Sequence, residues 1–392
     1  MKLPSNIKKV LDTLENAGYD AYVVGGSLRD ALLGRDAHDF DVTSSARPEE
    51  VISLFENEYH VIPTGLKHGT VTVVADGEPI EITTFRTDGE YSDSRRPDSV
   101  AFAATVEEDL SRRDFTVNAM AYNERRGLVD LFGGREDLEN KIIRCVGDAE
   151  TRFNEDALRI MRAFRFASQL DFLIDEQTLE AAIKTQYRLK NIACERKGSE
   201  MLRLLGGCAP SRSLCLMGDI ADLVLDAQVD HSRFSLIDKM PPDPIARLAL
   251  ILCGNATQKT ASALRLSSKD AQRLKILAAP PSKERLESRS DAEMRRIIAE
   301  YRGDAVTASH ISSLIYGVSD DAVSHLRRIA AQNPPVSLSD LKINGSDLIR
   351  LGVASGAAVG EVLEELLNKV IESPELNERG ALQEIALKMV KK

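Results

Sequence analysis

The 392-residue sequence has no tryptophan, only 5% aromatic residues and no long apolar run. Its longest apolar stretch, Leu248 to Cys253, is far shorter than the ~20 residues that span a bilayer. The chain opens with neither a charged leader nor an apolar segment. Instead, Lys2 to Ala17 predicts an amphipathic helix that ends at Gly18. We therefore expect no membrane partner.

Cysteine is also scarce. The sequence has five cysteines, an odd number, and none of them forms a C-x-x-C pair. This pattern argues against a disulfide framework and against a zinc site. Because free thiols are typical of a reducing compartment, we expect a cytoplasmic protein.

Positive charge is in deficit, with 51 lysines and arginines against 61 aspartates and glutamates. The formal net charge of −10 argues mildly against a nucleic-acid partner, which normally requires a basic surface. Residues 151–205 are a local exception, with ten basic and eight acidic side chains. That excess is too small to predict RNA binding by itself.

The remaining composition, 43% hydrophobic and 29% charged, is that of a globular protein long enough for two to four domains. The first part mixes strands and helices. Residues 71–85 predict a hairpin around Asp76-Gly77, and residues 87–99 predict a polar loop. After about residue 148 helical periodicity dominates, punctuated by proline pairs at 241–242, 280–281 and 334–335.

A glycine turn that opens a helix is the first chemical signal. Tyr22 to Val24 predicts a strand, and Ser27 to Leu33 predicts a helix after Gly25 and Gly26. Glycine lets the backbone approach a phosphate closely, and a helix N-terminus offers free N–H donors. Arg29, on the first turn, adds a charge able to bind phosphate.

Two aspartates separated by one residue follow this helix. Side chains at i and i+2 of a strand point to one face, so Asp39 and Asp41 are expected to converge while Phe40 faces the core. Two such carboxylates suit Mg²⁺ together with substrate phosphates. Each motif alone is more often a turn or a solvated strand end, but their order and spacing together favour function.

The segment 25–43, GGSLRDALLGRDAHDFDVT, resembles the signature of class II tRNA nucleotidyltransferases and bacterial poly(A) polymerases. The resemblance implies an α+β fold: a DNA polymerase beta-like nucleotidyltransferase head with a small mixed sheet, followed by an all-helical neck, body and tail. We expect the head at residues 1–147, the neck at 148–206, the body at 207–330 and the tail at 331–392. The tail looks like that of Gram-positive type members without an HD domain, which would clamp the elbow of tRNA.

The same resemblance implies how the reaction proceeds. Glu81 alternates with apolar neighbours and by itself reads as a solvent-facing strand residue. The resemblance implies that Glu81 is a third catalytic carboxylate beside Asp39 and Asp41, which are the expected ligands of Mg²⁺. The implied reaction is a two-metal in-line displacement that releases pyrophosphate.

Further blocks imply the nucleotide site. In the segment 112–119, RRDFTVNA, the family places Arg113 and Asp114 near the incoming ribose, supported by Asn118. Asp156 and Arg159, at i and i+3, are expected on one helix face. The simplest structural interpretation of such a pair is an intrahelical ion pair. Facing a pocket, an acceptor and a donor of this kind would accept cytosine and adenine and reject uracil and guanine. The expected nucleotide-binding residues are Gly25, Gly26, Ser27, Arg29, Arg113, Asp114, Asn118, Glu155, Asp156, Arg159, Arg162 and Arg165.

Two departures from the family pattern bear on geometry. Leu131 follows Asp130 where the family has proline, so we expect a looser hinge there. Lys197-Gly198 interrupts a segment that resembles a helical brace, and Gly weakens a helix by about 1 kcal/mol relative to Ala.

The resemblance implies an enzyme that adds the 3′-terminal CCA to tRNA without a nucleic-acid template, using CTP and ATP. Its expected partner is tRNA, contacted at the acceptor and T arms. The full-length segment 86–100 favours CCA addition over CC-only addition, while a CC-adding or A-adding enzyme of the same family stays an alternative. A poly(A) polymerase of the same family, a catalytically inactive RNA-binding protein and, from His38-Asp39, an HD phosphohydrolase are the alternatives; the last lacks the further grouped histidines it needs. Both a monomer and a homodimer are compatible with the sequence.

Overall fold

A computed structural model of the chain describes residues 3–37, 39–88, 100–255, 257–352 and 357–390. The chain divides into two compact units. The first comprises Met1–Gln228 and Ala263–Arg265, and the second comprises Val229–Ser262 and Leu266–Lys392. The four-part division predicted from the sequence is finer than this one and stays a prediction.

The first unit contains a seven-stranded sheet in the order β3-β4-β5-β2-β1-β8-β9. β2 and β5 run parallel, with Val42 opposite Ile82, while the other neighbours are antiparallel, so the predicted small mixed sheet is confirmed. The strands are β1 Ala21–Val24, β2 Asp41–Ser44, β3 His60–Gly65, β4 Thr70–Ala75, β5 Glu78–Thr84, β8 Met120–Asn123 and β9 Gly127–Asp130.

The predicted hairpin is the pair β4 and β5, joined at Asp76-Gly77. Beyond it, the short strands β6 Arg86–Asp88 and β7 Val100–Phe102 pair antiparallel. The loop expected between them at 87–99 lies, apart from its first two residues, outside the described residues.

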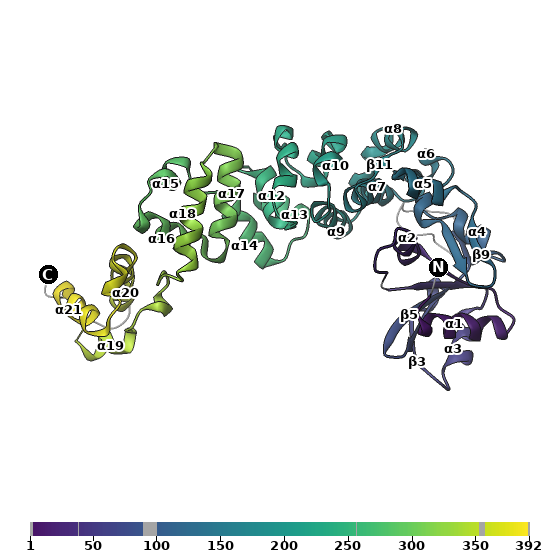
Figure 1. Ribbon diagram of the computed structural model, residues 1–392, viewed down its shortest axis with the longest axis horizontal. Coiled ribbons are helices and arrows are strands. Elements are labelled where there is room, and N and C mark those ends of the chain that lie inside the picture. Colours follow the sequence, from purple (N-terminus) through teal and green to yellow (C-terminus); the bar gives the residue numbers. More distant parts are fainter. Residues whose placement is uncertain (1–2, 38, 89–99, 256, 353–356, 391–392) are drawn as a thin grey trace. The chain divides into compact units, whose positions relative to one another are not determined.

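Helices cover the sheet of the first unit. α1 (Ser5–Asn16) and α3 (Pro48–Phe55) pack against each other and against β4 (Figure 1). α2 (Gly25–Leu32) packs on β1 and β8. The remaining helices of this part are α4 Val106–Ser111 and α5 Gly134–Asn140.

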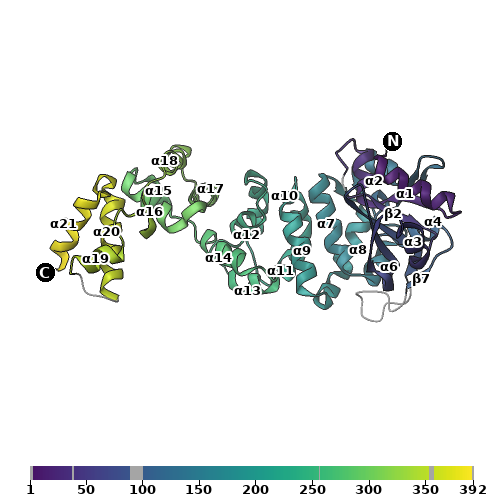
Figure 2. The ribbon, with the colours of Figure 1, turned by 90° about the horizontal axis from the view of Figure 1, so that it is seen from below.

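The helical remainder of the first unit centres on α7 (Leu158–Leu170), which is buried along most of its length. α9 and α10 pack on α7, and α8 packs on α6; Figure 2 shows α7, α9 and α10 side by side. Their bounds are α6 Ala149–Glu155, α8 Glu176–Thr185, α9 Cys194–Leu205, α10 Pro210–Met217 and α11 Asp219–Leu225, with the short parallel pair β10 Ile142–Ile143 and β11 Leu173–Ile174.

Gly198 stands in the middle of α9, yet the helix is continuous. A Cβ at this position would overlap the carbonyl oxygen of Leu264. The glycine therefore permits a close approach of the chain at residue 264, and the intrinsic helix weakness that the sequence suggests is outweighed by that packing.

The second unit is helical in every part that the structure describes as regular. Within it, the carbonyls of Ile371 and Glu372, at the end of α20, accept hydrogen bonds from buried Arg295 of α16. The helices are α12 Pro244–Leu252, α13 Thr257–Ala263 (its last residue in the first unit), α14 Ser268–Leu277, α15 Lys283–Glu287, α16 Asp291–Tyr301, α17 Ala305–Tyr316, α18 Asp320–Ala331, α19 Gly345–Arg350, α20 Ala357–Glu372 and α21 Arg379–Val390. In the described ranges, none of the helices has the length and apolar character needed to cross a bilayer.

Candidate active site

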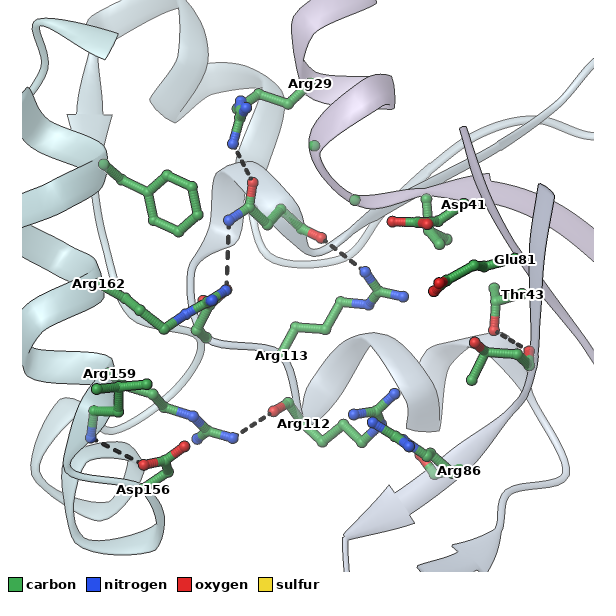
Figure 3. A pocket seen from close by; sticks show the side chains of 18 of the residues that line it. Arg29, Asp41, Thr43, Glu81, Arg86, Arg112, Arg113, Asp156, Arg159 and Arg162 are labelled. Atoms are coloured by element: carbon green, nitrogen blue, oxygen red, sulfur yellow. Dashed lines mark hydrogen bonds and ion pairs between the residues drawn. The ribbon is translucent and has the colours of Figure 1, made fainter. Parts of the chain in front are cut away.

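A cavity of about 680 Å³ opens in the first unit where the ends of β1, β2 and β5 face the segment 112–118 and α7 (Figure 3). Eight arginines and four carboxylates line it, so its charge is opposite in sign to that of the whole chain. Such an excess of guanidinium groups suits a polyanionic ligand. The lining residues are Val24, Gly25, Gly26, Arg29, Asp41, Val42, Thr43, Glu81, Thr83, Arg86, Arg112, Arg113, Asp114, Asn118, Asp156, Leu158, Arg159, Arg162, Arg165, Phe166 and Arg196.

The parallel strands β2 and β5 bring two carboxylates together. Asp41 and Glu81 each stand one residue before the register pair Val42 and Ile82, so they lie side by side at the cavity. Burial and the neighbouring Glu81 raise the pKa of Asp41 to about 6, although Arg113 opposes the shift. Two carboxylates that disfavour each other's charge are suited to a shared divalent cation.

Asp39 occupies a different position from the one the sequence predicts. β2 begins only at Asp41, and Asp39 precedes it in a left-handed conformation, with φ +53. It is exposed and does not belong to the lining of the cavity, although its charge contributes to the raised pKa of Asp41. The prediction that both aspartates project from one strand face is wrong, because i and i+2 alternation holds only where both residues have extended backbone.

Gly25 allows Asp41 to approach the start of α2. It has φ +78, which L side chains rarely adopt, and a Cβ there would lie 3.4 Å from Asp41 Oδ2. Gly25 and Gly26 both line the cavity beside the first turn of α2. Ser27 does not: its buried hydroxyl donates to the Val24 carbonyl at 3.5 Å.

Buried Asp109, in α4, holds two of the cavity arginines. Its carboxylate accepts from Arg112 Nη2 at 2.7 Å and from Arg113 Nη2 at 3.1 Å. Burial alone would raise the pKa of Asp109, but these two guanidinium groups hold it below its usual value. Arg112 and Arg113 are therefore fixed by a permanent negative charge.

Asp114 and Asn118 form the next layer of the site. Asp114 pairs with Arg162 of α7, at 2.5 Å from Nη2, and this guanidinium holds the pKa of Asp114 low against the opposing effect of burial. Asn118 accepts from Arg29 Nη1 at 2.9 Å and donates to Asp114 at 3.4 Å. The structure thus brings the predicted ribose residues into one connected network.

Asp156 and Arg159 both line the cavity, but not as neighbours on one helix face. α6 ends at Glu155, and Asp156 has extended backbone before α7 begins at Leu158. The predicted i and i+3 helical geometry is therefore wrong. Asp156 instead accepts from Leu158 N at 2.9 Å and from Arg196 Nη2 at 3.0 Å.

Arg159 is nearly buried and held at both ends of its guanidinium. It donates to Glu155 Oε2 at 2.6 Å. It also donates to the Arg112 carbonyl at 3.0 Å (Figure 3). Glu155 itself does not line the cavity, so its contact with Arg159 serves to hold the guanidinium in place. Asp156, an acceptor, and Arg159, a donor, both line the cavity, and so does Arg196, which donates to Asp156.

Several lining residues were not foreseen. Thr43 and Thr83 lie two residues after Asp41 and Glu81, and strand alternation could have found them. Arg112 and Arg196 stand within segments already singled out, next to residues of predicted function. Arg86 likewise begins the predicted segment 86–100, whereas Phe166 carries no such signal, because its position depends on long-range packing.

The sequence and the fold of this chain are similar to those of known proteins. Residues 21–144 match the family described as Poly A polymerase head domain, residues 171–219 the "Probable RNA and SrmB-binding site of polymerase A", and residues 284–386 tRNA nucleotidyltransferase domain 2. The CCA-adding enzyme of Levilactobacillus brevis is 36% identical over 96% of this chain and 95% of that protein. That of Geobacillus kaustophilus is 38% identical over 94% and 93%. The crystal structure of the Bacillus stearothermophilus CCA-adding enzyme in complex with CTP superposes with a TM-score of 0.83 at 33% identity, covering 100% of this chain and 98% of that one.

Proposed function

The chain belongs to the CCA-adding tRNA nucleotidyltransferases, and we propose that it builds the 3′-terminal CCA of tRNA from CTP and ATP by in-line nucleotidyl transfer, with release of pyrophosphate. One observation carries the proposal. A single arginine-rich cavity has the carboxylates Asp41 and Glu81 at one side and the acceptor–donor pair Asp156 and Arg159 at another. A nucleoside triphosphate has the matching order of groups: reacting phosphates, ribose and base.

Base choice follows from the hydrogen-bonding capacity of Asp156 and Arg159. A carboxylate only accepts and a guanidinium only donates. Cytosine and adenine each present an amino donor beside a ring-nitrogen acceptor, which satisfies both residues. Uracil and guanine present a carbonyl beside an N–H, so an acceptor of the base would face the carboxylate and a donor would face the guanidinium, a mismatch that excludes these bases.

Ribose recognition belongs to the network of Arg113, Asp114 and Asn118. Asp114 is kept ionised by Arg162 and can accept from a sugar hydroxyl, while Arg113 can donate to one. A deoxynucleotide lacks the 2′-hydroxyl and would forgo these hydrogen bonds. The cavity is thereby suited to ribonucleotides.

The polyphosphate would lie against the start of α2 and the arginines around it. Gly25 and Gly26 expose backbone there, and Arg29 and Arg162 supply positive charge. These groups bind and orient the triphosphate, so that the transfer relies on position and charge without a covalent intermediate.

The carboxylates fit Mg²⁺ by the chemistry of their oxygen donors and by the raised pKa of Asp41, which a cation would lower again. We propose Asp41 and Asp39 as metal ligands and Glu81 as a base or a tuning charge. Bound Mg²⁺ would supply activation of the RNA 3′-hydroxyl and neutralisation of the departing pyrophosphate. For Asp39 this role requires its side chain to turn towards Asp41.

The remaining helices would bind tRNA. We propose that the segments at 148–206, 207–330 and 331–392 act as neck, body and tail, with the acceptor and T arms as their targets. The matches of residues 171–219 and 284–386 to RNA-related families support this assignment.

The test is extension of tRNA transcripts that lack the CCA end, or that end in C or in CC, resolved to single nucleotides. Each nucleotide is supplied alone, and CTP and ATP are then supplied together. We expect a stop at CCA and no use of UTP or GTP. Long A-tails from ATP alone would identify a poly(A) polymerase, and a stop at CC would identify a CC-adding enzyme.

A further inference from the structure

One aromatic ring in the cavity has three arginines around it. Phe166, in α7, is 6% exposed and lines the cavity. The guanidinium carbons of Arg29, Arg162 and Arg165 lie 5.3, 5.3 and 3.8 Å from the centroid of its ring. A guanidinium within about 6 Å of an aromatic centroid is attracted by the negative face of the ring.

The three arginines come from two separate helices. Arg29 belongs to α2, whereas Arg162 and Arg165 belong to α7 together with Phe166. The ring is therefore the shared surface at which charges from two helices meet. The ring of Phe115 also packs on it in an edge-on arrangement, with centroids 5.8 Å apart and an interplanar angle of 79°.

Each of these arginines also has one carboxylate of its own. Arg29 pairs with Asp30, Arg162 with Asp114 and Arg165 with the buried Glu200. Further hydrogen bonds join Arg29 to Asn118 and Arg165 to Gln169, and Arg162 meets Asp114 through both Nε and Nη2. The shared ring adds to these contacts in restricting the three guanidinium groups.

We propose that Phe166 is a positioning residue for the triphosphate of the incoming nucleotide, acting by holding Arg29, Arg162 and Arg165 in the arrangement that binds a polyphosphate. The proposal rests on the proposed function for the identity of the nucleotide. The positioning role itself requires only a linear anion with several phosphate groups that binds to the three guanidinium groups.

The experiment compares three variants of the full-length chain. Phe166→Leu removes the aromatic face, Phe166→Tyr keeps it, and Phe164→Leu is the matched control. Phe164 is a fully buried residue of the same helix, and within the described ranges no arginine lies over its ring. Each variant is assayed for KM of CTP, KM of tRNA, kcat, and affinity for inorganic triphosphate without tRNA.

For Phe166→Leu we expect KM for CTP to rise about tenfold and affinity for inorganic triphosphate to fall by a similar factor, with KM for tRNA unchanged. Phe166→Tyr should restore both values to within about threefold of the original. Phe164→Leu should lower the unfolding temperature but leave triphosphate affinity unchanged.

Equal losses of triphosphate affinity in Phe164→Leu and Phe166→Leu would overturn the proposal, since both would then reflect general loosening of α7. Unchanged triphosphate affinity in Phe166→Leu would overturn it as well. If Phe166→Leu does not fold, Phe166→Met keeps more of the side-chain volume and serves in its place. If the original chain extends no tRNA but still binds triphosphate in a Phe166-dependent way, the proposed function fails and the role of Phe166 stands.

Discussion

Asp41 and Glu81 lie on the parallel strands β2 and β5, each one position before the register pair Val42 and Ile82. The sheet, and no local motif, makes them neighbours across 40 residues of sequence. Their mutual repulsion contributes to the raised pKa of Asp41. This pairing is the basis of the first two predictions.

Replacing Asp41 by Ala should abolish nucleotide addition, by about a thousandfold or more, because the cation would lose a ligand at the reacting phosphates. Asp39→Ala should have the same effect if Asp39 turns towards the cation. Binding of tRNA, measured by filter retention, should stay nearly intact in both. Asp36→Ala, an exposed aspartate of the same connection, is the control and should remain active. Substantial activity of Asp39→Ala would remove that residue from the metal assignment.

The pKa of Asp41 predicts a pH dependence. Protonation below about pH 6 should weaken cation binding, so that activity at limiting Mg²⁺ falls as pH drops through 6 and recovers with more Mg²⁺. Because the folded-state value lies above the ordinary 3.8, the folded chain retains a proton between about pH 4 and 6, and the cation-free protein should lose stability as pH rises through that window. Asp41→Asn should flatten this change in unfolding temperature. A profile identical in the variant would contradict the prediction.

Asp156→Ala should blur base selection. Without the acceptor, the carbonyl of uracil or guanine no longer faces a carboxylate oxygen, so the preference for CTP over UTP should fall at least about tenfold. Competition between the two nucleotides in single-addition assays measures this ratio. Glu180→Ala, an exposed change in α8, is the control. An unchanged preference in Asp156→Ala would place base selection elsewhere.

Gly198→Ala should destabilise the chain by about 1–3 kcal/mol, because the added Cβ would overlap the Leu264 carbonyl. Gly360→Ala, in the first turn of α20 with open space around the glycine, should instead stabilise by up to about 1 kcal/mol. Thermal unfolding of both variants gives the comparison. Equal shifts of the same sign would mean that helix propensity, rather than packing, decides the effect at Gly198.

The sequence by itself determined the local elements and most of the site's ingredients. The hairpin at Asp76-Gly77, the mixed head and the helical second part were predicted correctly, because turn chemistry and periodicity act over a few residues. The family was predicted correctly from the resemblance of residues 25–43 to its signature. Of the predicted nucleotide-binding residues, all but Ser27 and Glu155 line one cavity.

Tertiary structure alone decided how those residues meet. Asp39 precedes its strand, Asp156 stands at a break between two helices, and three arginines converge on Phe166. Each of these outcomes depends on the path of the backbone between distant segments and on which long-range contacts compensate buried charge. Neither is contained in the spacing of neighbouring residues, so periodicity could identify the side chains but not their partners.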